Sequence, residues 1–331
     1  MTIVCFSFFP VASASFSVGF RTLHLSGMKL NRVGLKALPS WEYLSKHVNR
    51  YNPVNLGVTL CNRLKTPYLH DLRFFGKMCD SAFTEYPQGI PRFHVILLNW
   101  PLDSLAVKFL SLADVVLCAD GAANNLFPFH SKAKTALAKL RLPSYICGDF
   151  DSVAPHVLKY YKSLGVPIIH NPCQDTTDTT KCWQKLQPRL LSGDKVILLG
   201  GIGGRFDHSV SNIGFLFKML KQDNLLPIQG RLEVFVIGEN NLCFLLPPGR
   251  NIVRFPTNFT TKYCGLLPLG GSCRWVTTSG LRWNMYRQKL DMSVLISSSN
   301  EISHDVVTVE NTDPVLWFSE IRKPTNFPIQ P

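Results

Sequence analysis

The chain has 331 residues and a formal net charge of +13, with 46% hydrophobic and 17% charged residues. This composition excludes a wholly disordered chain, and the length suits about two domains that each bury a core. Residues 1–77 contribute +8 of the charge, so the rest of the chain carries only +5. No run of Lys and Arg and no basic helix with interleaved aromatic residues follows, and we expect no nucleic-acid partner. No segment is long and apolar enough to predict a membrane span.

The N-terminal region is basic and poor in acids. Residues 1–20 are uncharged and contain Ala12-Ser13-Ala14, which is similar to a signal-peptide cleavage site, but the basic start of a secretory signal is missing. Met78, just before the first convincing strand, is a candidate start of translation. We treat residues 1–92 as a poorly ordered leader. The ten cysteines include no Cys-x-x-Cys pair, which indicates reduced thiols. These features predict a cytoplasmic protein, or a mitochondrial one if the leader is a transit peptide.

Residues 93–240 alternate short apolar runs with amphipathic stretches. The runs predict strands at 94–98, 115–119, 145–147, 166–169, 195–199 and 232–237. The stretches predict helices at 131–140, 155–164, 179–190 and 209–220. Near-continuous apolar strands between helices are typical of a mostly parallel sheet covered on both faces. We therefore predict an α/β catalytic domain over residues 93–240.

Residues 241–331 change to short strand candidates separated by Pro, Gly, Ser and Asn. The candidates are 241–246, 251–255, 263–267, 273–278, 292–297, 305–309 and 315–318. This spacing is typical of an all-β sandwich, which we predict as a second domain joined by a tight junction.

The acidic residues of the first predicted domain follow the strands. Asp120 ends one apolar run, Asp149 and Asp151 end another, and further acids come after the next two runs: Asp175, Asp178 and Asp207. In an open α/β sheet these places are neighbours at the carboxyl edge. Carboxylates about 5 Å apart repel by roughly 3 kcal/mol at an effective dielectric near 20, so the group calls for a cation. An all-oxygen set suits Mg²⁺. Any one Asp taken alone is better explained as a helix cap or turn residue, but all of them together are not.

Two further segments favour phosphate chemistry. Residues 175–181 place hydroxyl groups, Asp178 and Lys181 at a helix start. These residues are either an elaborate helix cap, or a metal-binding carboxylate beside an ammonium group that faces phosphate. Residues 200–208 form a glycine-rich link from strand to helix, whose amides and Arg205 could bind phosphate. Neither a dinucleotide fingerprint nor a P-loop motif occurs in the sequence.

Six segments in this order resemble eukaryotic thiamine pyrophosphokinases. They are residues 119–124, 148–152, 174–181, 200–207, 275–284 and 297–300, and the likeness runs from about Phe93 to Phe318. The resemblance implies an α/β ATP-binding domain, a β-sandwich thiamine-binding domain, and a homodimer whose active sites are shared between subunits. The implied reaction is ATP + thiamine → AMP + thiamine diphosphate. The family's usual Asp-Gly-Gly reads Asp120-Gly121-Ala122 here.

The resemblance also assigns residues to roles. Catalytic residues would be Asp120, Asp149, Asp151, Asp178, Lys181 and Arg205, with Mg²⁺ on Asp149, Asp151 and Asp178. ATP would be bound by Asp120, Gly121, Thr180, Lys181, Gly203, Gly204, Arg205 and Asp207. Gln174 would face the thiamine pyrimidine, Trp283 would stack on it across the dimer, and Ser297 with Asn300 would complete the pocket.

Two alternative functions stay open on sequence alone. Asp149 and Asp151 would also serve a nucleotide-sugar transferase, although that leaves residues 174–181 and Trp283 unexplained. A non-catalytic thiamine or nucleotide sensor would have little reason to keep mutually repelling carboxylates. Trp283 taken without its motif is better explained as a core aromatic of a sandwich.

Overall fold

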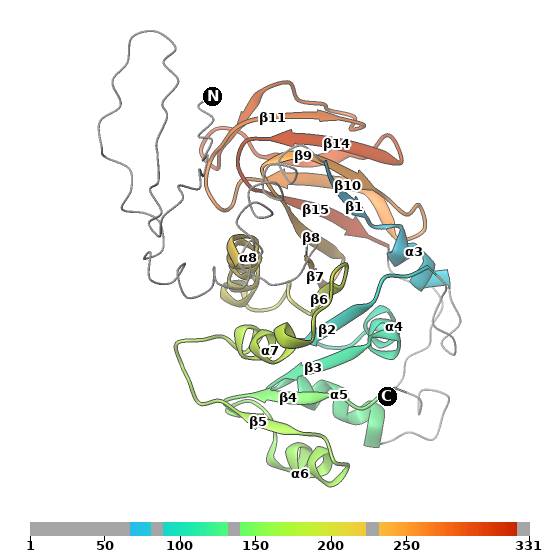
Figure 1. The fold of residues 1–331 in the computed structure, drawn as a ribbon, viewed down its shortest axis with the longest axis vertical. Helices are drawn as coiled ribbons and strands as arrows, with labels where there is room; N and C mark the ends of the chain where they lie inside the picture. Colours follow the sequence, from blue (N-terminus) through green and yellow to red (C-terminus); the bar gives the residue numbers. More distant parts are fainter. Residues whose placement is uncertain (1–66, 81–88, 132–139, 223–231, 323–331) are drawn as a thin grey trace, which may run out of the picture. The chain divides into compact units, whose positions relative to one another are not determined.

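A computed structural model describes residues 67–80, 89–131, 140–222 and 232–322, all within one unit of the chain, Leu64–Pro331. Its first half alternates strands and helices (Figure 1). The strands are β1 (Tyr68–Asp71), β2 (Phe93–Leu97), β3 (Val115–Ala119), β4 (Tyr145–Gly148), β5 (Ile168–His170), β6 (Lys195–Leu199) and β7 (Glu233–Gly238). The helices are α3 (Arg73–Asp80), α4 (Ser104–Leu112), α5 (Ala122–Ser131), α6 (Pro155–Ser163), α7 (Asp178–Leu186), the short 3-10 helix η3 (Gln187–Arg189) and α8 (Phe206–Gln222).

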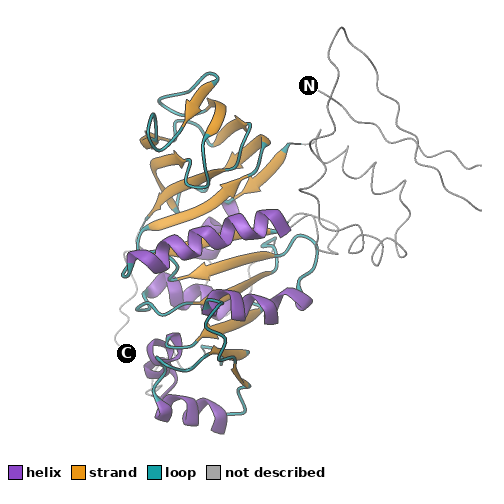
Figure 2. Cartoon of the chain, turned by 90° about the vertical axis from the view of Figure 1, so that its left-hand side faces the viewer, coloured by secondary structure: helices purple, strands orange, loops and turns teal. Residues whose placement is uncertain are grey.

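The second half is made of strands, as Figure 2 shows by the absence of purple from that part of the fold. They are β8 (Asn241–Leu246), β9 (Gly249–Arg254), β10 (Thr260–Leu267), β11 (Cys273–Ser279), β12 (Gln288–Leu290), β13 (Ser297–Glu301), β14 (Val306–Asn311) and β15 (Val315–Ile321). The predicted fold class, a helix-flanked α/β sheet followed by a β-rich part, is confirmed.

One ten-stranded sheet runs through both halves in the order β13-β10-β15-β8-β7-β6-β2-β3-β4-β5. The strands from β7 to β5 pair in parallel, and those from β8 to β13 pair antiparallel. The expected boundary at residue 240 falls in the hairpin between β7 and β8, where Gly238 pairs with Asn241. The division into 93–240 and 241–331 therefore stays a prediction about domains, since the hydrogen-bonded sheet continues across it.

Helices cover both faces of the parallel strands. Helices α3 to α6 pack on one face, and α7 and α8 pack on the other. Strand β2 is buried along its whole length, as a central strand covered on both sides must be. Helix α4 begins where the carboxylate of Asp103 accepts the amide of Ala106 at 2.8 Å, an N-cap that fixes the entry of the helix.

A second sheet of five strands, β1-β9-β14-β11-β12, faces the antiparallel strands of the first. Apolar side chains of both sheets form one hydrophobic cluster, in which Trp317 of β15 lies 5.5 Å from Phe255 between ring centroids. This is the sandwich that the sequence predicts, but it includes one strand from outside residues 241–331. Its edge strand β1 comes from the N-terminal region and pairs in parallel with β9.

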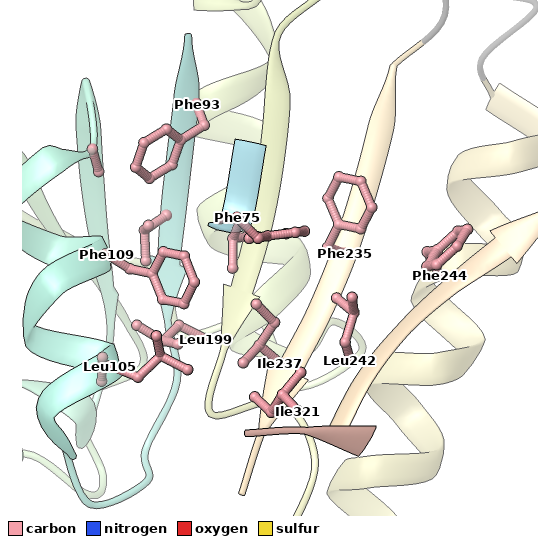
Figure 3. Packing of buried hydrophobic residues seen from close by; sticks show 14 of the residues in the cluster. Phe75, Phe93, Leu105, Phe109, Leu199, Phe235, Ile237, Leu242, Phe244 and Ile321 are labelled. Carbon is pink, nitrogen blue, oxygen red and sulfur yellow. The ribbon is translucent and has the colours of Figure 1, made fainter. Parts of the chain in front are cut away.

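Residues 67–80 lie within the segment expected to be a poorly ordered leader, and they are part of the core instead. Figure 3 shows Phe75 of α3 among side chains from the parallel sheet and its helices. Its ring centroid lies 4.9 Å from that of Phe259 and 5.2 Å from that of Phe235. Met78, the candidate translation start, is itself buried in this helix. A chain starting there would lack β1 and most of α3.

Other predictions differ in detail. Helices α4 and α5 were not predicted, and the helix expected at 131–140 lies almost wholly outside the described residues. The strand expected at 292–297 is a turn, because the carboxylate of Asp291 accepts the amide of Ser293 at 2.9 Å and its carbonyl accepts the amide of Leu295. No helix in the described ranges combines the length and apolar character that a membrane span needs. The eight cysteines in those ranges are free thiols.

Candidate active site

The carboxyl edge of the parallel strands carries the acids. Strand β2 lies between β3 and β6, and the chain leaves it for β3 on one side and returns to β6 on the other only after β5. In open α/β sheets ligands bind at such a switch point, outside the carboxyl ends of the strands. The loops after β3, β4 and β6 all open there, and they hold most of the predicted site residues.

Asp120 is a buried carboxylate held in a strained backbone conformation. Its φ is 39°, and its side chain follows β3 into the edge of the sheet with 2% exposure. Oδ2 accepts the amide of Ser152 at 3.1 Å, whereas Oδ1 has no hydrogen-bond partner. Burial, with smaller contributions from nearby acids, raises the pKa of Asp120 to about 6. A buried carboxylate oxygen without a protein partner, in a residue with a strained backbone, is a candidate ligand-binding group.

A sharp turn after β4 brings Asp149 and Asp151 to the same place. Phe150 between them has a φ of 64°, and its ring stacks on His170 at 5.4 Å between centroids. Gly148 precedes the turn, and a Cβ there would lie 2.6 Å from the Cβ of Asp120. Glycine is therefore needed for the two loops to approach one another.

Asp120, Asp149 and Asp151 converge. One carboxylate oxygen from each lies within 4.8 Å of the others. Three hard oxygen ligands, one of them buried without a partner, fit a cation such as Mg²⁺ and contain none of the sulfur or imidazole ligands that zinc prefers. The predicted metal set of Asp149, Asp151 and Asp178 differs from this trio by one member.

Asp178 lies beside the trio and is bound by Lys181. The Lys181 ammonium, 1% exposed, donates to Asp149 at 2.9 Å and to Asp178 at 3.0 Å. Burial tends to lower the pKa of Lys181, but the two carboxylates outweigh it and raise the pKa. The hydrogen bond from Lys181 lowers the pKa of Asp149, and burial raises that of Asp178. The ammonium thus balances two of the four clustered carboxylates.

The start of α7 fixes this lysine. Thr177 caps the helix by accepting the amide of Thr180 at 3.3 Å, so that Lys181 lies in the first turn and points to the trio. Gln174, in the preceding loop, donates to Asp149 at 3.1 Å. The predicted residues Gln174, Thr180 and Lys181 are therefore all placed at the acidic cluster or next to it. Gly121 adjoins it as well, since a Cβ there would lie 3.0 Å from that of Ser152.

The glycine-rich loop after β6 lies at the same edge. Gly204 has a φ of 60°, and a Cβ there would meet the ring of Trp100 at 2.4 Å. Trp100 follows β2 and was not predicted as a site residue, because no motif surrounds it. Arg205 and Asp207 form an exposed ion pair in which Nε of Arg205 lies 3.1 Å from Oδ1 of Asp207. Asp207 and Asp175 are thus not members of the convergent trio.

Three of the four residues predicted to bind thiamine, Trp283, Ser297 and Asn300, gather in the β-rich half, whereas Gln174 lies beside Asp149. Asn300 is 3% exposed; its Oδ1 accepts the amide of Trp283 at 3.2 Å, and its Nδ2 donates to the Trp283 carbonyl at 2.9 Å and to Ser297 at 3.2 Å. Trp283 itself is 51% exposed, with the Arg282 guanidinium 4.7 Å from its ring centroid. Asn300 therefore fixes the backbone of Trp283, whose indole ring is exposed. Within the described ranges, no hydrogen bond or ion pair joins this group to the acidic cluster.

Comparison with known proteins bears on both halves. The family profile described as "Thiamin pyrophosphokinase, catalytic domain" matches residues 106–227, and that described as "Thiamin pyrophosphokinase, vitamin B1 binding domain" matches residues 250–316. A thiamin pyrophosphokinase from Candida albicans shares the fold with a TM-score of 0.64 and 25% identity, covering 77% of this chain and 93% of that one. The yeast enzyme structure gives 0.61 at 24% identity, covering 77% and 91%.

Curated sequences agree. A thiamine pyrophosphokinase of Saccharomyces cerevisiae is 27% identical over 279 residues, covering 69% of this chain and 85% of that protein. One of Arabidopsis thaliana is 30% identical over 256 residues, which cover 74% of this chain and 90% of the plant protein. On this similarity, extending over both halves, the chain belongs to the thiamine pyrophosphokinase family.

Proposed function

We propose that the chain is a thiamine diphosphokinase, which transfers a diphosphoryl group from ATP to the hydroxyl of thiamine and releases AMP. The observation that carries the proposal is the convergence of Asp120, Asp149 and Asp151 with one buried oxygen unpartnered. Family membership supplies the substrates, since the relatives are named for the same activity.

In the reaction, the thiamine hydroxyl oxygen attacks the β-phosphorus of ATP and loses its proton, while the bond from the β-phosphorus to the oxygen bridging to the α-phosphorus breaks. Asp120, Asp149 and Asp151 would hold Mg²⁺. When bound, Mg²⁺ would offset the negative charge of the triphosphate. This assignment replaces Asp178 by Asp120 in the predicted metal set, because Asp120 is the carboxylate whose oxygen lies within 4.8 Å of those of both Asp149 and Asp151.

The chain's own cations act around this centre. Lys181 fixes Asp149 and Asp178 in place and has a third N–H available for a phosphate oxygen. Arg205 is exposed at the mouth of the glycine-rich loop, where its guanidinium can exchange Asp207 for phosphate oxygens. Stabilisation of developing charge and alignment of the reactants would supply most of the rate enhancement.

Thiamine would bind at Trp283, with Ser297 and Asn300 shaping the pocket. Large side chains exposed in the β-rich half support a homodimer in which this half meets the acidic edge of the other subunit: Tyr286 is 82% exposed, Met292 57% and Val294 65%. A site completed by a second copy agrees with the lack of any hydrogen bond or ion pair between the acids and the Trp283 group in the described ranges.

The test of activity is a product assay. The full chain is mixed with thiamine, Mg²⁺ and ATP, and we expect AMP and thiamine diphosphate in equal amounts. ADP with thiamine monophosphate, or no product, would contradict the proposal. Sugar nucleotides in place of thiamine should give no transfer, and production of AMP distinguishes an enzyme from a sensor.

The shared site has its own test. Asp149→Asn and Trp283→Ala chains are assayed separately at low thiamine and then after mixing and subunit exchange. If sites are shared, each mixed dimer has one site with both residues intact, and activity should recover to about a quarter of the wild-type value. No recovery after verified exchange would place both residues in the same subunit's site.

A further inference from the structure

A buried amide outside the acidic cluster joins two segments of the site. Asn212 lies on α8 with 7% exposure. Its Nδ2 donates to the carbonyl of Gly201 at 3.0 Å, and its Oδ1 accepts the hydroxyl of Thr179 at 2.9 Å. One side chain therefore ties the loop after β6 to the first turn of α7.

The chemistry of the partners fixes the orientation of this amide. A carbonyl oxygen can only accept, so the NH₂ group must face Gly201 and the amide oxygen must face Thr179. Thr179 is 4% exposed, and so both hydrogen bonds are sheltered from water. Losing either one would leave a buried polar group unsatisfied.

The two tethered segments carry the groups assigned to ATP. Thr179 immediately follows Asp178 and lies two residues before Lys181 on α7. Gly201 begins the loop that leads to Arg205. A second tether from α8 holds the same loop, because the amide of Gly203 donates to Oγ of Ser209 at 3.1 Å.

We propose that Asn212 is a positioning residue for the ATP half of the site: it sets the spacing between the glycine-rich loop and the carboxylate and ammonium at the start of α7. The proposal rests on the proposed function. A triphosphate that contacts both segments would bind well only when their spacing is fixed in advance. Thiamine, bound at Trp283, would not depend on it.

The sharpest variant is Asn212→Asp. It keeps the size of the side chain and the acceptor toward Thr179, but it puts a carboxylate oxygen against the Gly201 carbonyl. We expect a rise of about tenfold or more in both KM for ATP and Kd for Mg·ATP measured by calorimetry on the full chain. KM for thiamine should stay within about twofold of the wild-type value.

The matched control is Asn311→Asp. Asn311 is 2% exposed, and its Nδ2 donates to the backbone carbonyls of Pro247 at 3.0 Å and Leu246 at 3.3 Å in the β-rich half. The same chemical change there should leave Kd for Mg·ATP within about twofold of wild type. An equal rise in both variants would show general destabilisation and overturn the positioning role.

A milder variant keeps the test decisive if Asn212→Asp does not fold. Thr179→Val removes only the hydroxyl donor, and we expect a rise of about threefold in Kd for Mg·ATP. Unchanged Mg·ATP binding in the folded variants overturns the proposal. Because this readout needs no turnover, it separates the proposal from the proposed function: a wild-type chain that binds Mg·ATP but forms no AMP would refute only the latter.

Discussion

The parallel and antiparallel strands of one sheet carry opposite kinds of surface. Around the carboxyl edge of the parallel strands, four carboxylates and a buried lysine crowd together. The antiparallel part and its facing sheet expose large side chains instead, among them Trp283 and Tyr286. The first surface suits a charged, metal-bound ligand and the second suits an aromatic one. This contrast is what the proposed binding of ATP at one surface and thiamine at the other requires.

We expect the largest loss of activity from a substitution at the acidic edge. Asp149→Asn removes one charge from the convergent trio and weakens the partner of Lys181, and we expect turnover to fall by about a thousandfold or more. Circular dichroism and thermal unfolding should stay close to wild type. Asp313→Asn, which alters an acid paired with Arg274 in the β-rich half, is the control and should keep its activity. Substantial turnover in Asp149→Asn would break the contrast between the two surfaces.

The core that joins the halves is tested by Phe75→Ala. This side chain, with 0% exposure, contacts aromatic rings from both halves, and we expect the free energy of unfolding to fall by about 3 to 5 kcal/mol. Urea unfolding measures this loss of free energy.

Truncation tests the N-terminal elements. A chain starting at Met78 should fail to fold, whereas one starting at Leu64 should fold, since only the second retains β1 and α3. A stable, active chain from Met78 would contradict this part of the account.

A buried polar contact links the two sheets. Glu233 of β7 lies 2.9 Å from Nδ1 of His70 in β1 and also pairs with Lys195. Burial opposes the shift, but the hydrogen bond to His70 and the charge of Lys195 outweigh it and lower the pKa of Glu233 to about 2. Since the folded pKa lies below the usual value, the contribution of Glu233 to stability is present above pH 4.5 and is lost as the pH falls toward 2. The loss is roughly 3 kcal/mol. Denaturant unfolding at several pH values should show this slope, and Glu233→Gln should flatten it.

We expect the smallest effect from substituting the exposed aromatic residues of the β-rich half. Trp283→Ala should raise KM for thiamine about tenfold and leave KM for ATP unchanged, because the exposed indole is assigned to thiamine and not to ATP. Tyr286→Ala, an even more exposed aromatic nearby, should stay within about twofold on both. An equal change in KM for both substrates would argue against separate surfaces.

Much of the site was predictable from the positions of acids after apolar runs. Strand ends determine which loops meet, so the sequence alone groups Asp120, Asp149 and Asp151 at one edge of the sheet. What pattern alone could not give was which carboxylate Lys181 would neutralise, since that depends on the rotation of α7 about its axis. Trp100 was not predicted because no motif surrounds it, and its contact with Gly204 depends on how two loops far apart in the sequence meet.

The helices and strands with a strong hydrophobic periodicity were predictable from the sequence. Those whose structure depends on tertiary contacts were not. β1 is four residues long and gains its place only by pairing with β9, far along the chain. The turn at Asp291 overrides an apolar stretch that otherwise indicates a strand. The sheet continues from β7 to β8 through a hairpin. A hairpin has the same sequence pattern within one domain as between two, so the sequence does not reveal this continuity.

Binding of Mn²⁺ in place of Mg²⁺, followed by its electron paramagnetic resonance in the presence of a non-hydrolysable ATP analogue, tests the convergence of the three carboxylates most directly. We expect Asp120→Asn, Asp149→Asn and Asp151→Asn each to weaken Mn²⁺ binding by about tenfold or more, while Asp207→Asn has a much smaller effect. Wild-type affinity in all three variants would contradict the account.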